Sequence, residues 1–408
     1  MSRTELRPTL VLLTSIFLLP VLVAQFVAQG LPAFMRLAGH PAETIGLVIL
    51  AGLPFTLSFL WAPMVDRYGW SRFGYRRGWL LGTQSAILVG LLSFLLLDPA
   101  VDPLLLILVA AVLMGLIGTY MAAAGGWMLD RLPKRHHASG AAAHAAARGA
   151  GGVVLGLGIL YFLGDLGWVA CVLALACTSL LGWLLIAARP MDRGVARPPR
   201  DARPSLFANL AIFKRREVLL VFLFVQLMDL GIILTFALRP ILQVDAGFSL
   251  SEIGLLGVVG GNAVGMIGAV AATPVIKRLG AVGTLAIVAL AALLMNGVVA
   301  FGLASGGAST AVDPGLTIFY VLTYGFLGFA GFTAGRTLFL GLCAEGRHAT
   351  DFMTLLSVDA AAALMMAGFG SAIAGSLGLA ATFAVAAVAA ALACLSAALL
   401  RSRRPDWP

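Results

Sequence analysis

Apolar runs long enough to cross a membrane fill nearly the whole of this 408-residue chain. The sequence is 61% hydrophobic and 11% charged, whereas a soluble chain is roughly 45–50% apolar and about 25% charged. A membrane-spanning helix needs roughly 20 apolar residues, and at about 34 residues per helix and connection the chain has room for about twelve. We therefore predict an all-α integral membrane protein.

The spans divide into two sets of six. In the first half we expect them at 9–34, 43–63, 78–97, 104–129, 139–162 and 168–188, and in the second half at 218–243, 251–275, 281–304, 316–343, 352–374 and 380–400. The predicted domains are a six-helix bundle over 1–188, a linker over 189–216 and a second six-helix bundle over 217–408. The end of the linker, 205–216, has apolar residues near helical spacing and a basic end, which predicts a short amphipathic helix on the inner leaflet.

Basic residues predict the orientation. They follow the even-numbered spans, crowd the linker and close the chain, for example at Arg76, Arg131 and Lys277. The positive-inside rule places all these connections, and both termini, in the cytoplasm. The short connections at 98–100, 164–165, 307–314 and 375–378 then lie outside. The net charge of +9 is explained by this topology, so no nucleic-acid partner is expected.

Two stretches of the chain resemble each other. Residues 29–69 open the first half and residues 238–280 open the second. Leu31-Pro32 aligns with Arg239-Pro240, and Ile45-Gly46-Leu47 aligns with Ile253-Gly254-Leu255 at the same offset. Such duplication indicates a repeated unit, and duplicated membrane halves with a binding site at their interface are typical of secondary transporters.

Signals of an enzyme are missing from the sequence. It has no Walker loop, no Gly-x-Ser-x-Gly elbow and no metal-type cysteine or histidine spacing, so we predict neither a catalytic residue nor a cofactor nor a bound metal. A membrane-embedded acyl- or lipid-transferase would need such a constellation and is the least favoured alternative.

Ionisable residues inside the predicted spans are the main candidates for function. Each costs roughly 2.5–3.5 kcal/mol at a helix centre and therefore should face water or a polar partner. They are His144, Arg148, Asp229, Arg336 and Asp359. The two arginines indicate an anionic substrate, although Arg336 and Asp359 can equally form an internal ion pair.

Three of these groups are candidates for proton coupling. Asp229 lies near mid-span with Gln226 one turn before it; it is either a proton carrier or a hydrogen-bonded structural residue. Asp359 is the next candidate. His144 lies one turn from Arg148, and imidazole changes its charge near neutral pH.

Softer polar and aromatic groups complete the predicted substrate site. Those selected are Gln25, Gln29, Tyr120, Trp127 and Met228. They suit an amphipathic, ring-containing ligand, but aromatic and methionine side chains are also ordinary core residues. The neighbouring Gly125-Gly126 allows either a close ligand or close helix packing.

The segment Phe59-Leu60-Trp61-Ala62-Pro63-Met64-Val65-Asp66-Arg67 resembles the FLWAP-x-x-DR signature of one branch of the major facilitator superfamily. That branch includes muropeptide permeases, acetyl-coenzyme A transporters and bacterial siderophore permeases of the pyochelin and rhizobactin type. Gln29-Gly30-Leu31-Pro32 also matches, and Arg148-Gly149 resembles part of a span-five motif. The chain departs from the pattern in span four, where relatives carry an acidic residue and this chain has only Asp130 at the helix end.

The resemblance implies two pseudo-symmetric six-helix bundles that work by alternating access. Asp66 and Arg67 match the loop motif that controls conformation, in which a carboxylate near another helix's N-terminus is favoured by the helix dipole. We expect a monomeric inner-membrane protein of a bacterium that uses the proton gradient to import a siderophore or metal-siderophore complex, pyochelin-like, from the periplasm. The alternative substrate is a muropeptide or other sugar-peptide.

Overall fold

The computed structural model describes residues 3–41, 44, 47–69, 74–155, 167–189, 205, 209–305 and 312–403. These residues form helices and no β-strand, so the prediction of an all-α protein is confirmed. Nine helical runs in the described residues are long and apolar enough to cross a membrane. One of them, Gly254–Ser305, covers two of the predicted spans, which meet at a non-helical kink at Gly280.

The chain forms two compact units, which are described separately. Unit 1 comprises Met1–Arg135, Gly151–Ile212 and Leu342–Val358, and unit 2 comprises His136–Ala150, Phe213–Gly341 and Asp359–Pro408. Each unit therefore takes one short segment from the other half of the sequence, and two helices, α8 (His137–Val153) and α15 (His348–Leu377), contribute to both. The predicted domain boundaries at 188 and 217 stay a prediction.

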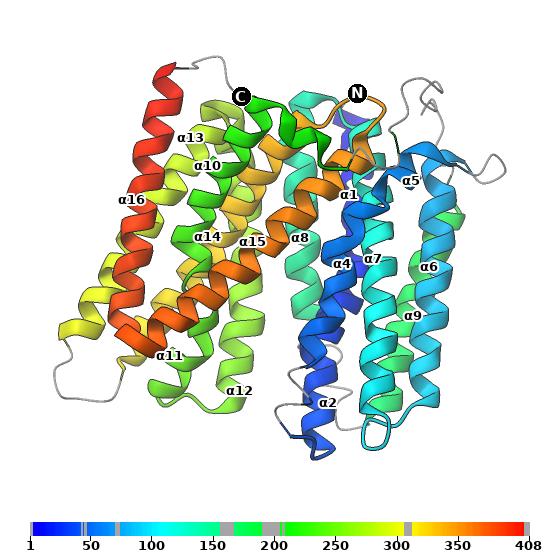
Figure 1. Ribbon diagram of the computed structural model, residues 1–408, viewed down its shortest axis with the longest axis horizontal. Helices are drawn as coiled ribbons and strands as arrows, with labels where there is room; N and C mark the ends of the chain where they lie inside the picture. Colours follow the sequence, from blue (N-terminus) through cyan, green and yellow to red (C-terminus); the bar gives the residue numbers. More distant parts are fainter. Residues whose placement is uncertain are drawn as a thin grey trace. The chain divides into compact units, whose positions relative to one another are not determined.

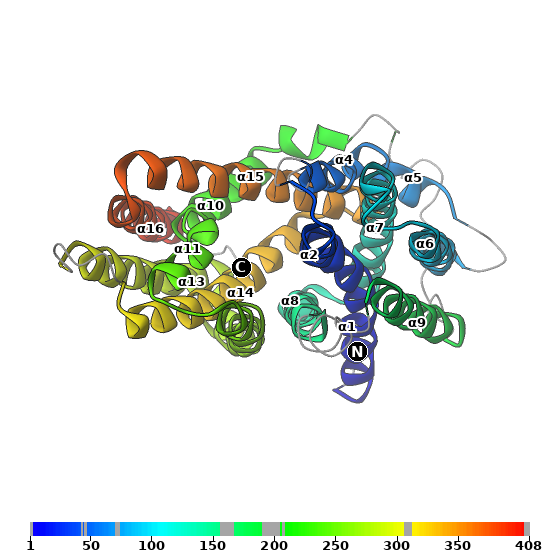
Figure 2. The ribbon, with the colours of Figure 1, turned by 90° about the horizontal axis from the view of Figure 1, so that it is seen from below.

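Unit 1 is built around four long helices. These are α1 (Arg3–Gln25), α6 (Tyr75–Ser93), α7 (Pro103–Arg131) and α9 (Trp168–Ala187). Helix α6 packs against α7 and α9, and α1 packs against the same two helices (Figures 1 and 2). Shorter elements complete the unit: η1 (Phe26–Gly30), α2 (Leu31–Leu37), η2 (Leu47–Gly52), α4 (Leu53–Leu57), η3 (Ser58–Leu60), α5 (Ala62–Arg67) and η4 (Phe94–Leu96).

Unit 2 contains α10 (Arg216–Ile233), α13 (Gly261–Ser305), α14 (Pro314–Leu342) and α16 (Leu379–Arg403) as its long helices. Helix α16, red in Figure 1, packs against both α10 and α13. Helix α13 bends at Gly280, whose φ of 75° lies in the left-handed region that favours glycine. The shorter elements are η10 (Phe236–Leu238), α11 (Arg239–Asp245), α12 (Leu250–Ile253) and η11 (Gly254–Gly260).

The two related stretches share an interrupted helix. Pro32 and Pro240 each occupy the second position of a short helix, α2 or α11. Because proline lacks an N–H and clashes with the carbonyl four residues earlier, the preceding turn changes its winding. That turn is the π-helical η1 in unit 1 and the 3₁₀ segment η10 in unit 2. The interruption expected at Gln29–Pro32 is thus present.

A capping box starts α12. The backbone N–H and hydroxyl of Ser249 donate to the Glu252 carboxylate at 2.8 and 2.6 Å, an arrangement that satisfies donors at a helix start. These hydrogen bonds from Ser249 hold the pKa of Glu252 below its ordinary value. The contact caps the start of α12, which leads into η11 and α13.

Several predicted features lie outside the described residues. These are the connection at 164–165, most of the connection at 307–314, the end of the fifth span after residue 155, and most of the linker at 190–204. Of the amphipathic helix predicted at 205–216, residues 206–208 are not described; Asn209–Lys214 form the 3₁₀ segment η9, and α10 begins at Arg216.

Candidate functional site

A buried charge network lies in unit 1, centred on Asp66 at the end of α5. Its Oδ1 accepts from the Ala349 backbone N–H at 3.2 Å, and its Oδ2 accepts from the Thr350 backbone N–H at 2.7 Å and from the Thr350 hydroxyl at 2.6 Å. Ala349 and Thr350 belong to the first turn of α15, where backbone donors have no partner within the helix. Asp66 therefore occupies the helix-N-terminus position that the family resemblance implies.

Arg76 is the cation of this network. Its Nη2 lies 2.8 Å from Asp66 Oδ1, and its Nε lies 2.8 Å from Asp130 Oδ2. Asp130 Oδ1 lies 2.6 Å from His348 Nδ1. Asp130 stands in the last turn of α7, where the helix dipole disfavours a carboxylate, so Arg76 and His348 compensate for an unfavourable position.

The glycines of α7 are explained by packing in unit 1. A Cβ on Gly126 would come within 2.7 Å of the Arg76 guanidinium carbon, and a Cβ on Gly125 would overlap the ring of Phe352. Of the two interpretations of Gly125-Gly126, close packing is the one with a structural basis. Gly126 leaves room for the buried arginine.

Arg67, which was predicted together with Asp66 to control conformation, is exposed at the end of α5. The cation that pairs with Asp66 is Arg76, which is 1% exposed. In the sequence, Arg76 serves only as a topology signal, and nothing there marks His348 or Thr350 as members of this network. The one signal of this network in the sequence was Asp130, the acidic residue at the end of span four.

A second group of charges lies in unit 2, on α14 and the helices around it. Asp359 on α15 accepts from Arg336 Nη2 at 2.7 Å and from Gln226 Nε2 at 2.8 Å. Arg336 is 4% exposed. The ion-pair alternative for Arg336 and Asp359 is therefore the arrangement found, and Gln226 serves Asp359 where the sequence analysis had paired it with Asp229.

The ring of Phe332 is shared by three of the predicted residues. The guanidinium carbons of Arg336 and Arg148 lie 4.9 and 5.7 Å from its centroid, and the imidazole of His144 meets it edge-on with centroids 5.3 Å apart. His144 is buried, whereas Arg148 is exposed. Within the described residues Arg148 makes no ion pair, so its stacked guanidinium keeps its hydrogen-bond donors available.

Asp229 lies near this group. It is half-buried on α10, within electrostatic reach of Asp359, Arg336 and Arg148. In the part of the chain that the structure describes, its carboxylate has no hydrogen-bond partner. Asp229 and Asp359 thus differ: the second is fixed by two donors and the first is not.

A third arginine in unit 2, Arg239, was not selected as a site residue from the sequence. Its guanidinium carbon lies 4.4 Å from the centroid of the Phe236 ring and 4.8 Å from that of the Tyr324 ring. Its side chain also donates to the Phe236 carbonyl at 3.4 Å. Arg148 lies within electrostatic reach of both Arg239 and Tyr324.

The remaining predicted substrate residues do not belong to the group of charges in unit 2. Gln29 donates to Gln25 at 2.5 Å in unit 1, beside the π-helical turn. Tyr120 and Trp127 are 0% and 1% exposed in the core of unit 1, and Met228 is 3% exposed in unit 2. These three side chains have the burial of core residues, the alternative that the sequence left open. The described residues hold no cluster of three or more His, Cys, Asp or Glu that could bind a metal.

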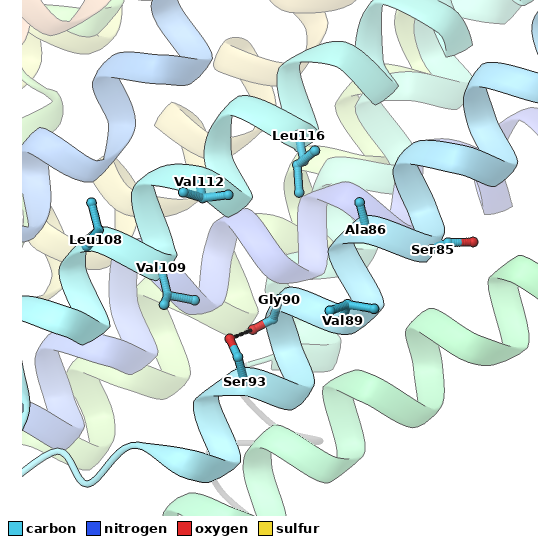
Figure 3. A pocket seen from close by; sticks show the side chains of 9 residues that line it. All are labelled: Ser85, Ala86, Val89, Gly90, Ser93, Leu108, Val109, Val112 and Leu116. Carbon is cyan, nitrogen blue, oxygen red and sulfur yellow. Dashed lines mark hydrogen bonds between the residues drawn. The ribbon is translucent and has the colours of Figure 1, made fainter.

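An apolar groove runs between α6 and α7 on unit 1 (Figure 3). It is lined by Ser85, Ala86, Val89, Gly90, Ser93, Leu108, Val109, Val112 and Leu116. None of these is ionisable, and the Ser93 hydroxyl is already bonded to the Gly90 carbonyl. The groove is a surface for apolar contact and offers nothing to an anion.

Comparison with known proteins points to a single family. The family model described as Major Facilitator Superfamily matches residues 13–358. The anhydromuropeptide permease of Escherichia coli (strain K12) is 26% identical over 357 residues, which cover 82% of this chain and 69% of the permease. An uncharacterized protein of Haemophilus influenzae is 43% identical over 72 residues, or 18% of this chain and 17% of that protein.

Solved structures of transporters have the same fold. The human organic anion transporter MFSD10 (TETRAN) has a TM-score of 0.69 at 16% identity, and a bacterial homologue of the iron transporter ferroportin in its outward-facing state has a TM-score of 0.70 at 17% identity. Each comparison covers 96% of this chain and 99% of the other. At these identities the likeness concerns the fold alone, and it agrees with the architecture expected from the sequence.

Proposed function

Because the chain belongs to the Major Facilitator Superfamily, and is thus a multi-pass secondary transporter, we propose that it imports an anionic sugar-peptide of the muropeptide class. The proposed membrane is the inner membrane of a bacterium, and the proposed mechanism is alternating access driven by the proton gradient. The relative that aligns over 82% of the chain is an anhydromuropeptide permease.

This proposal reverses the order of the two substrates expected from the sequence. From the sequence, siderophore import was the first expectation, because the chain resembles a branch that contains both kinds of permease. One relative with long coverage is named as an anhydromuropeptide permease, and neither relative reported above is named as a siderophore permease. The former alternative therefore becomes the main proposal.

The observation that supports an anionic substrate most directly is the state of Arg148. An arginine within a membrane protein needs an anion or water, and Arg336 already has Asp359. Arg148 is held against Phe332 without an ion pair in the described residues. A planar guanidinium binds a carboxylate through two parallel hydrogen bonds, and the peptide part of a muropeptide carries carboxylates.

Asp229 is the proposed proton-coupling residue. It lies beside the arginines but lacks a fixed donor in the described residues, so its charge state is free to change when the anion binds or leaves. Asp359 is held by Arg336 and Gln226 and is better suited to keeping Arg336 in place.

The test is uptake of radiolabelled anhydromuropeptide by cells that lack their own permease and express this chain. We expect accumulation that a protonophore collapses, with no accumulation of a labelled ferric siderophore of the pyochelin type. Uptake of the siderophore alone would contradict the substrate proposal and restore the earlier expectation.

A further inference from the structure

We propose that Arg239 forms a second anion subsite in unit 2, so that the substrate is an extended molecule with two carboxylates, one on Arg148 and the other on Arg239. This inference rests on the proposed function, whose substrate class it makes more specific. It starts from three arginines that stack on aromatic rings, of which only Arg336 has an ion-pair partner among the described residues.

Helix α14 supplies the platform for these arginines. Tyr324, Gly328, Phe332 and Arg336 follow one another at intervals of four residues, which places them along one ridge of the helix. Arg239 stacks on Tyr324 and Arg148 stacks on Phe332. The two rings are eight residues apart, about 12 Å along the axis at 1.5 Å per residue.

Gly328 lies between the two rings and leaves the ridge open. A Cβ built there would have only one described atom within 4 Å, on the ring of Tyr324 at 3.9 Å. At Gly328, therefore, the described side chains leave space beside the helix. A ligand can lie along it.

The duplication argues that the fold does not require a cation at position 239. Leu31 occupies the matching position in the first copy, at the start of α2, and it is fully buried. The same break before a proline is thus built with leucine in one copy and arginine in the other. Within the described residues Arg239 contacts two aromatic rings and one backbone carbonyl but has no carboxylate partner.

The spacing restricts the ligand. An extended peptide advances about 3.3–3.6 Å per residue, so carboxylates on the order of 10 Å apart are separated by about three residues. A peptide, or a sugar joined to a peptide, is long enough.

The experiment measures binding to the purified full-length protein by titration calorimetry. The probes are an anhydromuramyl peptide with two free carboxylates and the same peptide with its terminal carboxylate amidated. Amidation should weaken binding to the wild type about 10- to 100-fold, the effect of losing one charge-assisted hydrogen-bonded pair. Arg239→Leu should weaken binding of the first probe by a similar factor and leave binding of the second unchanged.

Two control variants separate a ligand contact from a structural role. Arg239→Lys keeps the charge and should retain part of the discrimination between the probes, and Gly328→Leu should weaken both probes because it fills the ridge. Equal loss of both probes in Arg239→Leu, or equal affinity of the wild type for both, would overturn the second subsite. If the wild type binds neither probe, the proposed function fails, and the inference fails with it.

Discussion

The charged side chains of unit 1 and those of unit 2 differ in how fully they are paired. In unit 1 the Asp66 carboxylate accepts from two backbone donors, a hydroxyl and Arg76, and Asp130 lies between Arg76 and His348. Of the three ring-stacked arginines of unit 2, only Arg336 has a carboxylate partner in the described residues; Arg148 contacts a ring, and Arg239 contacts two rings and the Phe236 carbonyl. A saturated network stabilises a conformation, and an unsaturated one is suited to a charged guest.

The physical reason is the cost of burial. Asp66 and Arg76 are at most 1% exposed, and a buried charge without full compensation destabilises a protein by several kcal/mol. Arg148 is exposed, so water can solvate it until an anion arrives. The contrast between the two regions makes different variants informative in each.

The largest effect on stability is expected from Arg76→Ala. It leaves the buried Asp66 and the partly buried Asp130 without their shared cation, which should cost about 3–5 kcal/mol. The measurement is thermal unfolding of the purified protein together with the yield of folded protein. The matched control is Arg67→Ala, an exposed neighbour expected to change stability by less than about 0.5 kcal/mol. Similar unfolding of the two variants would show that the network contributes little.

Arg148→Ala should lower uptake about 100-fold or more, to the point of abolishing it in practice. The amount of folded protein should not change. Removing an exposed guanidinium that has no ion pair in the described residues leaves no buried carboxylate unpaired. Arg148→Lys keeps the charge but loses the planar fork, so it should raise the KM for uptake more than it lowers kcat. Normal binding by Arg148→Ala, or its absence from the membrane, would assign Arg148 a structural role.

The two aspartates of unit 2 should behave differently. Asp229→Asn should prevent accumulation against a gradient while allowing exchange, because it removes a titratable group without breaking a described hydrogen bond. Asp359→Asn removes the partner of buried Arg336 and should lower the thermal stability as well. Accumulation by Asp229→Asn that a protonophore still abolishes would move the coupling role to another residue.

The all-α, multi-pass character and the family could be predicted because their signals are local in the sequence. Apolar runs indicate membrane spans wherever they occur. The segment from Phe59 to Arg67, which carries the family resemblance, is contiguous in the sequence. Even the interruption before Pro32 follows from local chemistry, since a proline perturbs the turn that precedes it.

The partners of the charged residues could not be predicted in this way. Arg76 and Asp130 are 54 positions apart, and Asp130 and His348 are 218 apart. Gln226 lies one turn from Asp229 in sequence but donates to Asp359, 133 positions away. Which of two nearby acids a side chain reaches depends on tertiary packing, and so does the stacking of Arg239 on Tyr324.

The smallest effect is expected from Gln226→Leu, which tests whether the unit 2 ion pair depends on its amide donor. The variant removes the 2.8 Å hydrogen bond to Asp359 but leaves Arg336 in place. Because Asp359 is 16% exposed, water can replace part of the lost bond, and we expect a destabilisation of about 1 kcal/mol. The control is Gln243→Leu, a 2% exposed glutamine whose Nε2 has no partner among the described residues; that change should be neutral or stabilising, since an unsatisfied buried donor is removed. Thermal unfolding of both variants distinguishes the cases. If Gln226→Leu is as harmless as Gln243→Leu, Arg336 alone is sufficient to hold Asp359, and the contrast between Asp359 and Asp229 rests on that single ion pair.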